Sequence, residues 1–122
     1  MSYLIEVERD ISKGTGTLTY KHGTVSVTTP CWFELANPIP AKKYIGCSAT
    51  HMQTKKNSKG QKREGIYLPD NQTKKRGIFI HMGVSSAWSD GCIVIKEGEM
   101  LAIWNSIAPK NGGNVSVIVR DK

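Results

Sequence analysis

A histidine and a cysteine flank a short polar link in the segment 77–95, which reads GIFIHMGVSSAWSDGCIVI. His81 ends one unbroken apolar run, and Cys92 opens the next. A cysteine reacts as its thiolate, and an adjacent imidazole can accept the thiol proton. If the two runs are neighbouring strands, the pair suits nucleophilic catalysis. The alternative is structural, because a cysteine is often a small core residue and a histidine often bonds a loop carbonyl.

Gly91 directly precedes the cysteine and could serve the same chemistry. A glycine lets the backbone turn sharply and lets a substrate approach closely. The amides of Gly91 and Cys92 could then form an oxyanion hole for a tetrahedral intermediate.

The elements that must position this pair are mainly strands. Alternating or β-branched runs predict strands at residues 2–8, 15–20, 24–28, 31–35, 43–48 and 115–119. Between the second and third runs, Lys21, His22 and Gly23 predict a hairpin turn. The unbroken apolar runs 77–81 and 91–95 predict central strands covered on both faces.

One helix is predicted near the end of the chain, over residues 97–107, where apolar residues recur at helical spacing. Residues 52–62 are almost entirely polar and predict a mobile surface loop. The predicted fold is therefore mostly β, with one α-helix in the C-terminal half.

Length and composition favour one globular domain that spans residues 1–122. With 39% hydrophobic and 22% charged residues, the chain resembles an average globular protein rather than a disordered one. No apolar stretch is long enough for a transmembrane helix, and residues 1–6 lack the pattern of a secretory signal.

The positive charge is concentrated in the middle of the sequence. The net charge is +7, and residues 42–76 contain ten Lys and Arg against only Glu64 and Asp70. This asymmetry predicts an anionic partner such as nucleic acid, a membrane or a carboxylate-rich polymer. The alternative is a solvated loop that lysines keep soluble.

The three cysteines do not indicate a metal site, because Cys31, Cys47 and Cys92 lack zinc-ligand spacing. No cofactor motif is present either. Since an odd count leaves at least one thiol unpaired, Cys31 and Cys47 are expected to be buried thiols or, as the weaker alternative, a mutual disulfide.

Residues 80–83 (IHMG) and 89–93 (SDGCI) resemble the cysteine-nucleophile motif of the L,D-transpeptidase (YkuD-type) catalytic domain. In that family a histidine after an apolar strand is followed by Ser/Thr-His-Gly-Cys and a second apolar strand. Residues 37–44 (NPIPAKKY) are similar to the family's Pro-x-Gly-x-Tyr/Phe segment, without its glycine. Asp90 and Val94 stand where the family usually has histidine and arginine.

The resemblance spans residues 15–120 in element order and implies a β-sandwich or β-barrel with one helix. It implies acyl transfer through a Cys92 thioester, with His81 as the general base and Gly91 shaping the oxyanion site. Ser89 and Asp90 would orient the loop, although both also suit a simple turn.

Further positions are assigned to the site. A carbonyl near Met82 or Gly83 is expected to hold the second imidazole nitrogen of His81. Trp88 could line a substrate groove, or it could cover the core. His51 borders the basic region and could touch the substrate.

Two functions follow from these patterns. The first is an L,D-transpeptidase or L,D-carboxypeptidase that acts on peptidoglycan stem peptides. It would be a small, divergent phage- or secretion-associated member, with a secretion or immunity partner. It would act in the periplasm or cell wall if secretion or lysis delivers it, and otherwise it would be cytoplasmic. The second is a non-catalytic basic module that binds nucleic acid or another polyanion, although region 55–76 offers only Tyr67 for stacking.

Overall fold

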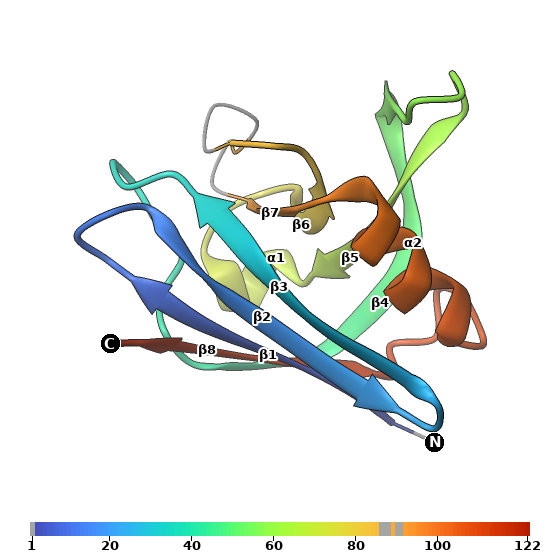
Figure 1. The fold of residues 1–122 in the computed structure, drawn as a ribbon, viewed down its shortest axis with the longest axis horizontal. Helices are drawn as coiled ribbons and strands as arrows, with labels where there is room; N and C mark the ends of the chain where they lie inside the picture. Colours follow the sequence, from blue (N-terminus) through green and yellow to red (C-terminus); the bar gives the residue numbers. More distant parts are fainter. Residues whose placement is uncertain (1, 86–88, 90–91) are drawn as a thin grey trace.

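The chain folds into a closed β-barrel with a helix packed against its side (Figure 1). The structure is a computed structural model that describes residues 2–85, 89 and 92–122. Within them, the strands are β1 (Tyr3–Asp10), β2 (Thr15–His22), β3 (Val25–Phe33), β4 (Lys43–Lys56), β5 (Lys62–Leu68), β6 (Ile78–Met82), β7 (Ile93–Ile95) and β8 (Val115–Asp121). The helices are the short α1 (Asp70–Thr73) and α2 (Glu97–Ser106).

The barrel order is β1-β2-β3-β7-β6-β5-β4-β8. Neighbouring strands are antiparallel except for two parallel pairs, β1 with β8 and β6 with β7. Helix α2 packs against β3, β5 and β6. The mostly β fold with one C-terminal-half helix is therefore confirmed, and its architecture is a barrel. No helix of the described residues is long and apolar enough to cross a membrane.

Alternation along the strands fills the barrel, as the sequence predicts. In β1, Tyr3, Ile5 and Val7 are buried in the core cluster, while Leu4 between them is exposed. The hairpin between β2 and β3 is also confirmed, and Gly23 in its turn has a φ of +60°. One difference is that the runs 24–28 and 31–35 belong to a single strand, β3.

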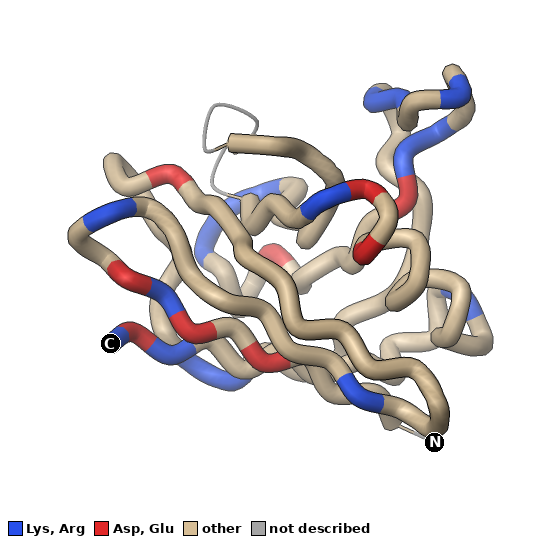
Figure 2. Tube along the Cα trace, in the orientation of Figure 1, with Lys and Arg blue, Asp and Glu red and all other residues tan. Residues whose placement is uncertain are grey.

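The prediction of a loop at residues 52–62 is wrong. Strand β4 continues to Lys56 and β5 begins at Lys62, so only residues 57–61 form a turn. Asn57 closes this turn, because its backbone N–H donates to Gln61 O at 2.8 Å and its side-chain oxygen accepts from Lys59 N at 2.9 Å. Backbone pairing holds the hairpin without an apolar side-chain pattern. We call residues 52–64 the β4–β5 arm, and Figure 2 shows the Lys and Arg that gather on it.

An inward-pointing arginine closes one end of the barrel. Arg9 continues the inward alternation of β1, and its Nε donates to Asp121 Oδ1 on β8 at 2.6 Å. The Arg9 side chain is 2% exposed and the Asp121 side chain is 33% exposed. The guanidinium also lies over the Phe33 ring, 5.1 Å from its centroid.

We expect Asp121→Ala to lower the free energy of unfolding by about 3 kcal/mol, because it leaves the buried Arg9 charge without its carboxylate. The Arg120–Glu6 pair is the control, since its side chains are 55% and 40% exposed. Glu6→Gln should change stability by less than about 1 kcal/mol. Urea denaturation of both variants measures the difference, and equal losses would contradict the assignment.

Candidate active site

The two central strands bring the sequence-predicted pair into one region. Strands β6 and β7 are adjacent and parallel, with His81 opposite Val94 in the register. Because side chains alternate, Ile78 and Ile80 enter the core, while Phe79 and His81 project from the opposite face of β6.

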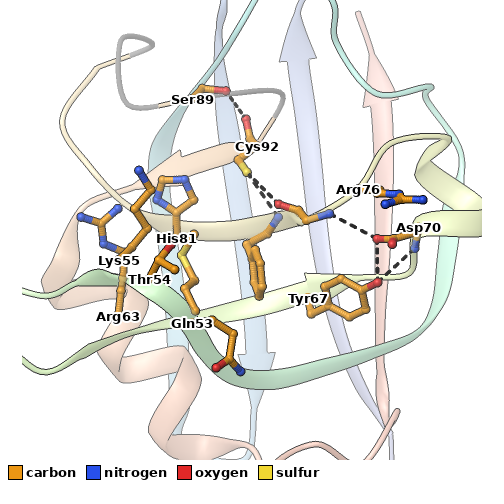
Figure 3. Close-up of a pocket in the computed structure, with 13 residues that line it drawn as sticks. Gln53, Thr54, Lys55, Arg63, Tyr67, Asp70, Arg76, His81, Ser89 and Cys92 are labelled. Atoms are coloured by element: carbon orange, nitrogen blue, oxygen red, sulfur yellow. Dashed lines mark hydrogen bonds between the residues drawn. The ribbon is translucent and has the colours of Figure 1, made fainter.

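A cavity of about 950 Å³ lies at this face, next to the β4–β5 arm (Figure 3). The described residues that line it are Met52, Gln53, Thr54, Lys55, Arg63, Tyr67, Asp70, Arg76, Gly77, Phe79, His81, Ser89 and Cys92. Both members of the predicted pair therefore border the same space.

The Cys92 sulfur is held by the backbone of β6 and the residue before it. The side chain is buried, with 4% of the residue exposed. Phe79 N–H donates to Sγ at 3.4 Å, and the thiol donates to Gly77 O at 3.8 Å. These two contacts fix the position of the sulfur at the edge of the cavity, where it could act as a nucleophile.

Ser89 fixes the backbone at the cysteine. Its hydroxyl donates to Cys92 O and accepts from the backbone N–H of Glu34 at 3.2 Å. It therefore joins the end of β3 to the residue that carries the sulfur. This arrangement suits the predicted loop-orienting role.

The hydrogen bonding of His81 leaves a lone pair for proton transfer. Only 3% of the residue is exposed, and Nδ1 lies 2.8 Å from Met82 O. Because a carbonyl can only accept, Nδ1 carries the proton and Nε2 carries the lone pair. The carbonyl that holds the ring is thus that of Met82, whereas Gly83 donates its N–H to Ile95 O at 2.9 Å.

Burial lowers the pKa of His81 below its ordinary value of 6.5. The Met82 carbonyl opposes this shift, and the positive charges of Arg63 and Lys55 add to it. The imidazole therefore stays neutral, and able to accept a proton, at a pH where a solvated histidine is already protonated.

We expect the acidic limb of kcat/KM to lie below pH 6.5, because the imidazole loses its lone pair only there. The free energy of unfolding should also fall as the pH falls below 6.5. As the pH falls, the unfolded chain protonates His81 before the folded protein does, because the folded-state pKa lies below 6.5. The stability that the neutral imidazole contributes is therefore complete above pH 6.5 and is lost as the pH falls. NMR titration of the imidazole, assigned with His81→Gln, measures the pKa directly. A midpoint above 6.5 would contradict the burial argument.

A series of hydrogen bonds that connects Tyr67, Asp70 and Gly77 to the Cys92 sulfur also borders the cavity. Tyr67 O–H donates to Asp70 Oδ1 at 2.7 Å, and Gly77 N–H donates to the same oxygen at 3.2 Å. The carbonyl of Gly77 in turn accepts from the Cys92 thiol. Hydrogen bonding to Asp70 raises the pKa of Tyr67, so its hydroxyl stays protonated.

The other sequence-predicted site residues are placed differently. His51 is exposed and faces away from Met52, with its ring centroid 4.9 Å from that of Trp104 on α2. It is not among the described residues that line the cavity. Trp88, Asp90 and Gly91 lie outside the described residues. Their assigned roles stay predictions.

Sequence reasoning missed several lining residues, among them Lys55, Arg63, Tyr67 and Asp70. The excess of positive charge at residues 42–76 fits a carboxylate-bearing substrate, but the sequence does not indicate which of these cations lie beside the cysteine. The pairing of β4 with β5 and of β5 with β6 brings these side chains to the same cavity.

Cys31 and Cys47 are buried thiols, as expected, and not a disulfide. Burial raises the pKa of each to about 12. Both are part of the core cluster and neither borders the described cavity. They provide two reference thiols against which the reactivity of Cys92 can be measured.

Comparison with known protein families identifies the class. The family model of the L,D-transpeptidase catalytic domain (YkuD) matches residues 9–119 of the sequence, so the chain belongs to this family. A search of curated proteins gives no match.

Solved structures show the same fold at low sequence identity. L,D-transpeptidase 1 of Mycobacterium tuberculosis matches with a TM-score of 0.57 and 14% identity, over 97% of this chain and 62% of that one. A Bdellovibrio bacteriovorus protein matches with a TM-score of 0.58 and 17% identity, over 98% and 47%. The helical cell shape determining protein Pgp2 of Campylobacter jejuni matches with a TM-score of 0.55 and 12% identity, over 99% of this chain and 49% of that one. The chain thus spans less than two thirds of each of these proteins.

Proposed function

We propose that this domain is a cysteine acyltransferase or peptidase that acts on peptidoglycan stem peptides, as an L,D-transpeptidase or L,D-carboxypeptidase. Family membership supports the class of reaction. The observation that carries the proposal is that Cys92 and His81 border one cavity, with the imidazole lone pair on Nε2. The site of action would be the periplasm or the cell wall.

The proposed first half-reaction forms a thioester. Nε2 of His81 accepts the Cys92 thiol proton, and the sulfur attacks the carbonyl carbon of an L,D peptide bond. The tetrahedral intermediate collapses with cleavage of the C–N bond. The His81 imidazolium returns its proton to the departing amine, which leaves as a terminal D-amino acid.

The second half-reaction decides the outcome. An incoming amine gives its proton to His81 and attacks the thioester carbon, which forms a new amide and restores the thiol. If water attacks instead, the product is a shortened peptide acid. The backbone amides of Gly91 and Cys92 are the predicted donors to the oxyanion in both halves.

The cavity also bears on the non-catalytic alternative. Lys55, Arg63 and Arg76 line the space that contains His81 and Cys92, so part of the basic charge belongs to the site. Tyr67 packs its ring 5.4 Å from that of Phe79 and bonds its hydroxyl to Asp70. These contacts favour the enzyme over a nucleic-acid module.

The test is mass spectrometry of isolated murein incubated with the protein and a labelled free D-amino acid. Trimming, exchange or cross-linking each gives a distinct mass change. We expect at least one of them, and the label reports transfer to an amine. Unchanged murein, together with salt-sensitive DNA binding, would replace the proposal with the polyanion module.

A further inference from the structure

The β4–β5 arm carries a basic surface on the face that is turned away from the catalytic cavity. Lys56 on β4 lies directly opposite Lys62 on β5 in the strand register. Their chain neighbours Lys55 and Arg63 line the cavity, and successive side chains of a strand point to opposite faces. Lys56 and Lys62 therefore project together from the outer face of the arm, and both residues are exposed.

The pairing of two lysines is unfavourable for the protein alone. Like charges directly opposite each other on neighbouring strands repel and destabilise the strand pair. Within the described residues, neither Lys56 nor Lys62 takes part in an ion pair. Glu64 is the only acidic residue of the arm, and its Oε1 accepts from Asn57 Nδ2 at 3.0 Å. An anion from outside the chain, bound between the two lysines, would relieve their repulsion.

Backbone and side-chain bonds hold the arm in place before any partner binds. Arg63 Nε donates to Lys56 O at 2.9 Å across the hairpin, which fixes the backbone at the lysine pair. The arm is also tied to helix α2, because the hydroxyl and backbone N–H of Ser58 donate to Glu97 Oε2 at 2.9 and 3.2 Å. Since the backbone is already ordered, binding at the outer face costs little further loop entropy.

The chemistry of the proposed substrate supplies such an anion. Peptidoglycan is a polymer whose stem peptides carry free carboxylates, so a stem peptide in the cavity has further carboxylates near it on the same polymer. The arm borders the cavity, and its outer face is therefore within reach of these neighbours. Residues 52–64 contain no aromatic side chain, so the arm lacks the stacking platform on which single-stranded nucleic acids bind.

We propose that the outer face of the arm, formed by Lys56 and Lys62, binds carboxylates of polymeric peptidoglycan and holds the domain on the polymer while a stem peptide occupies the cavity. This inference rests on the proposed function. A soluble stem peptide fills the cavity without reaching the outer face, so the domain prefers the polymer. Individually weak contacts suffice, because the second contact with the same polymer forms at a high effective concentration.

The test is co-sedimentation of the Cys92→Ala protein with isolated murein. Adding Lys56→Gln/Lys62→Gln should weaken binding about tenfold, because each exposed ion pair contributes a factor of a few. The control Lys13→Gln/Lys21→Gln removes the same charge from exposed residues of the β1–β2 turn and β2, and should bind as tightly as Cys92→Ala alone. Murein whose carboxyl groups have been converted to amides should bind equally with and without the arm substitutions. Unchanged binding after the arm substitutions, or the same tenfold loss on amidated murein, would overturn the proposed surface.

A rate comparison separates this inference from the proposed reaction. With the catalytic cysteine present and murein below saturation, Lys56→Gln/Lys62→Gln should lower the ratio of the rate on murein to the rate on a soluble stem tetrapeptide about tenfold. Murein binding that depends on both lysines, without turnover in the parent protein, would reject the reaction and retain the surface. An unchanged ratio with unchanged binding would overturn the surface while turnover still supports the reaction. Lysine-dependent binding of duplex DNA or anionic vesicles, with murein binding unaffected, would also overturn it.

Discussion

Cys92→Ala is expected to lower turnover of stem peptides by at least about 10⁴-fold. Without the sulfur no thioester forms, and His81 has no thiol to activate. The substitution removes the contacts of Sγ with Phe79 N and Gly77 O, which are modest, so the barrel should remain folded. Muropeptide analysis measures the activity, and circular dichroism measures the fold.

Cys47→Ala is the matched control for this change. It also shortens a cysteine of the buried core cluster to alanine, but Cys47, unlike Cys92, does not border the described cavity. Its kcat/KM per folded molecule should match that of the parent protein. If Cys92→Ala trims or transfers stem peptides within tenfold of the parent rate, another group is the nucleophile.

His81→Gln is expected to lower kcat/KM by about 10²- to 10⁴-fold, the usual contribution of a positioned general base. Glutamine has similar bulk and can donate its amide N–H to Met82 O, but it cannot take a proton at the position of Nε2. The rate that remains should depend on hydroxide concentration, because the thiol must then ionise without a partner.

The control for the histidine is His51→Gln, the same substitution at an exposed residue that packs on Trp104. It should leave kcat/KM within about twofold. A His81→Gln variant that keeps a third or more of the parent activity, with an unchanged pH profile, would remove His81 from the proposed mechanism.

The sequence signals that succeeded were those with a direct physical origin. The apolar residues before His81 reflect a central strand, because Ile78 and Ile80 fill the core and Phe79 packs against it beside the cavity. Strand β6 accordingly pairs with β7. The alternation in β1 likewise predicted its buried face as far as Val7. Strand β1 then turns a charge inward at Arg9, where the ion pair with Asp121 and the Phe33 ring offset the cost of burial.

The failures arise where backbone bonds or distant neighbours decide the structure. The β4–β5 arm has no apolar alternation, so its ladder and the Asn57 turn were invisible to pattern reasoning. Tyr67 and Asp70 reach the cysteine through the backbone of Gly77, a relation that exists only after β5 and β6 pair. The pairing of β6 with its neighbours β5 and β7, rather than any local motif, assembles this part of the site.

The alkylation rates of the three cysteines at neutral pH test the central claim most directly. Peptide mapping after timed exposure of the native protein to iodoacetamide gives all three rates in one sample. We predict that Cys92 reacts at least about 100-fold faster than Cys31 and Cys47, because each of these has its pKa raised to about 12 by burial. If Cys92 reacts as slowly as the two core thiols, it is not an activated nucleophile and the proposed mechanism fails.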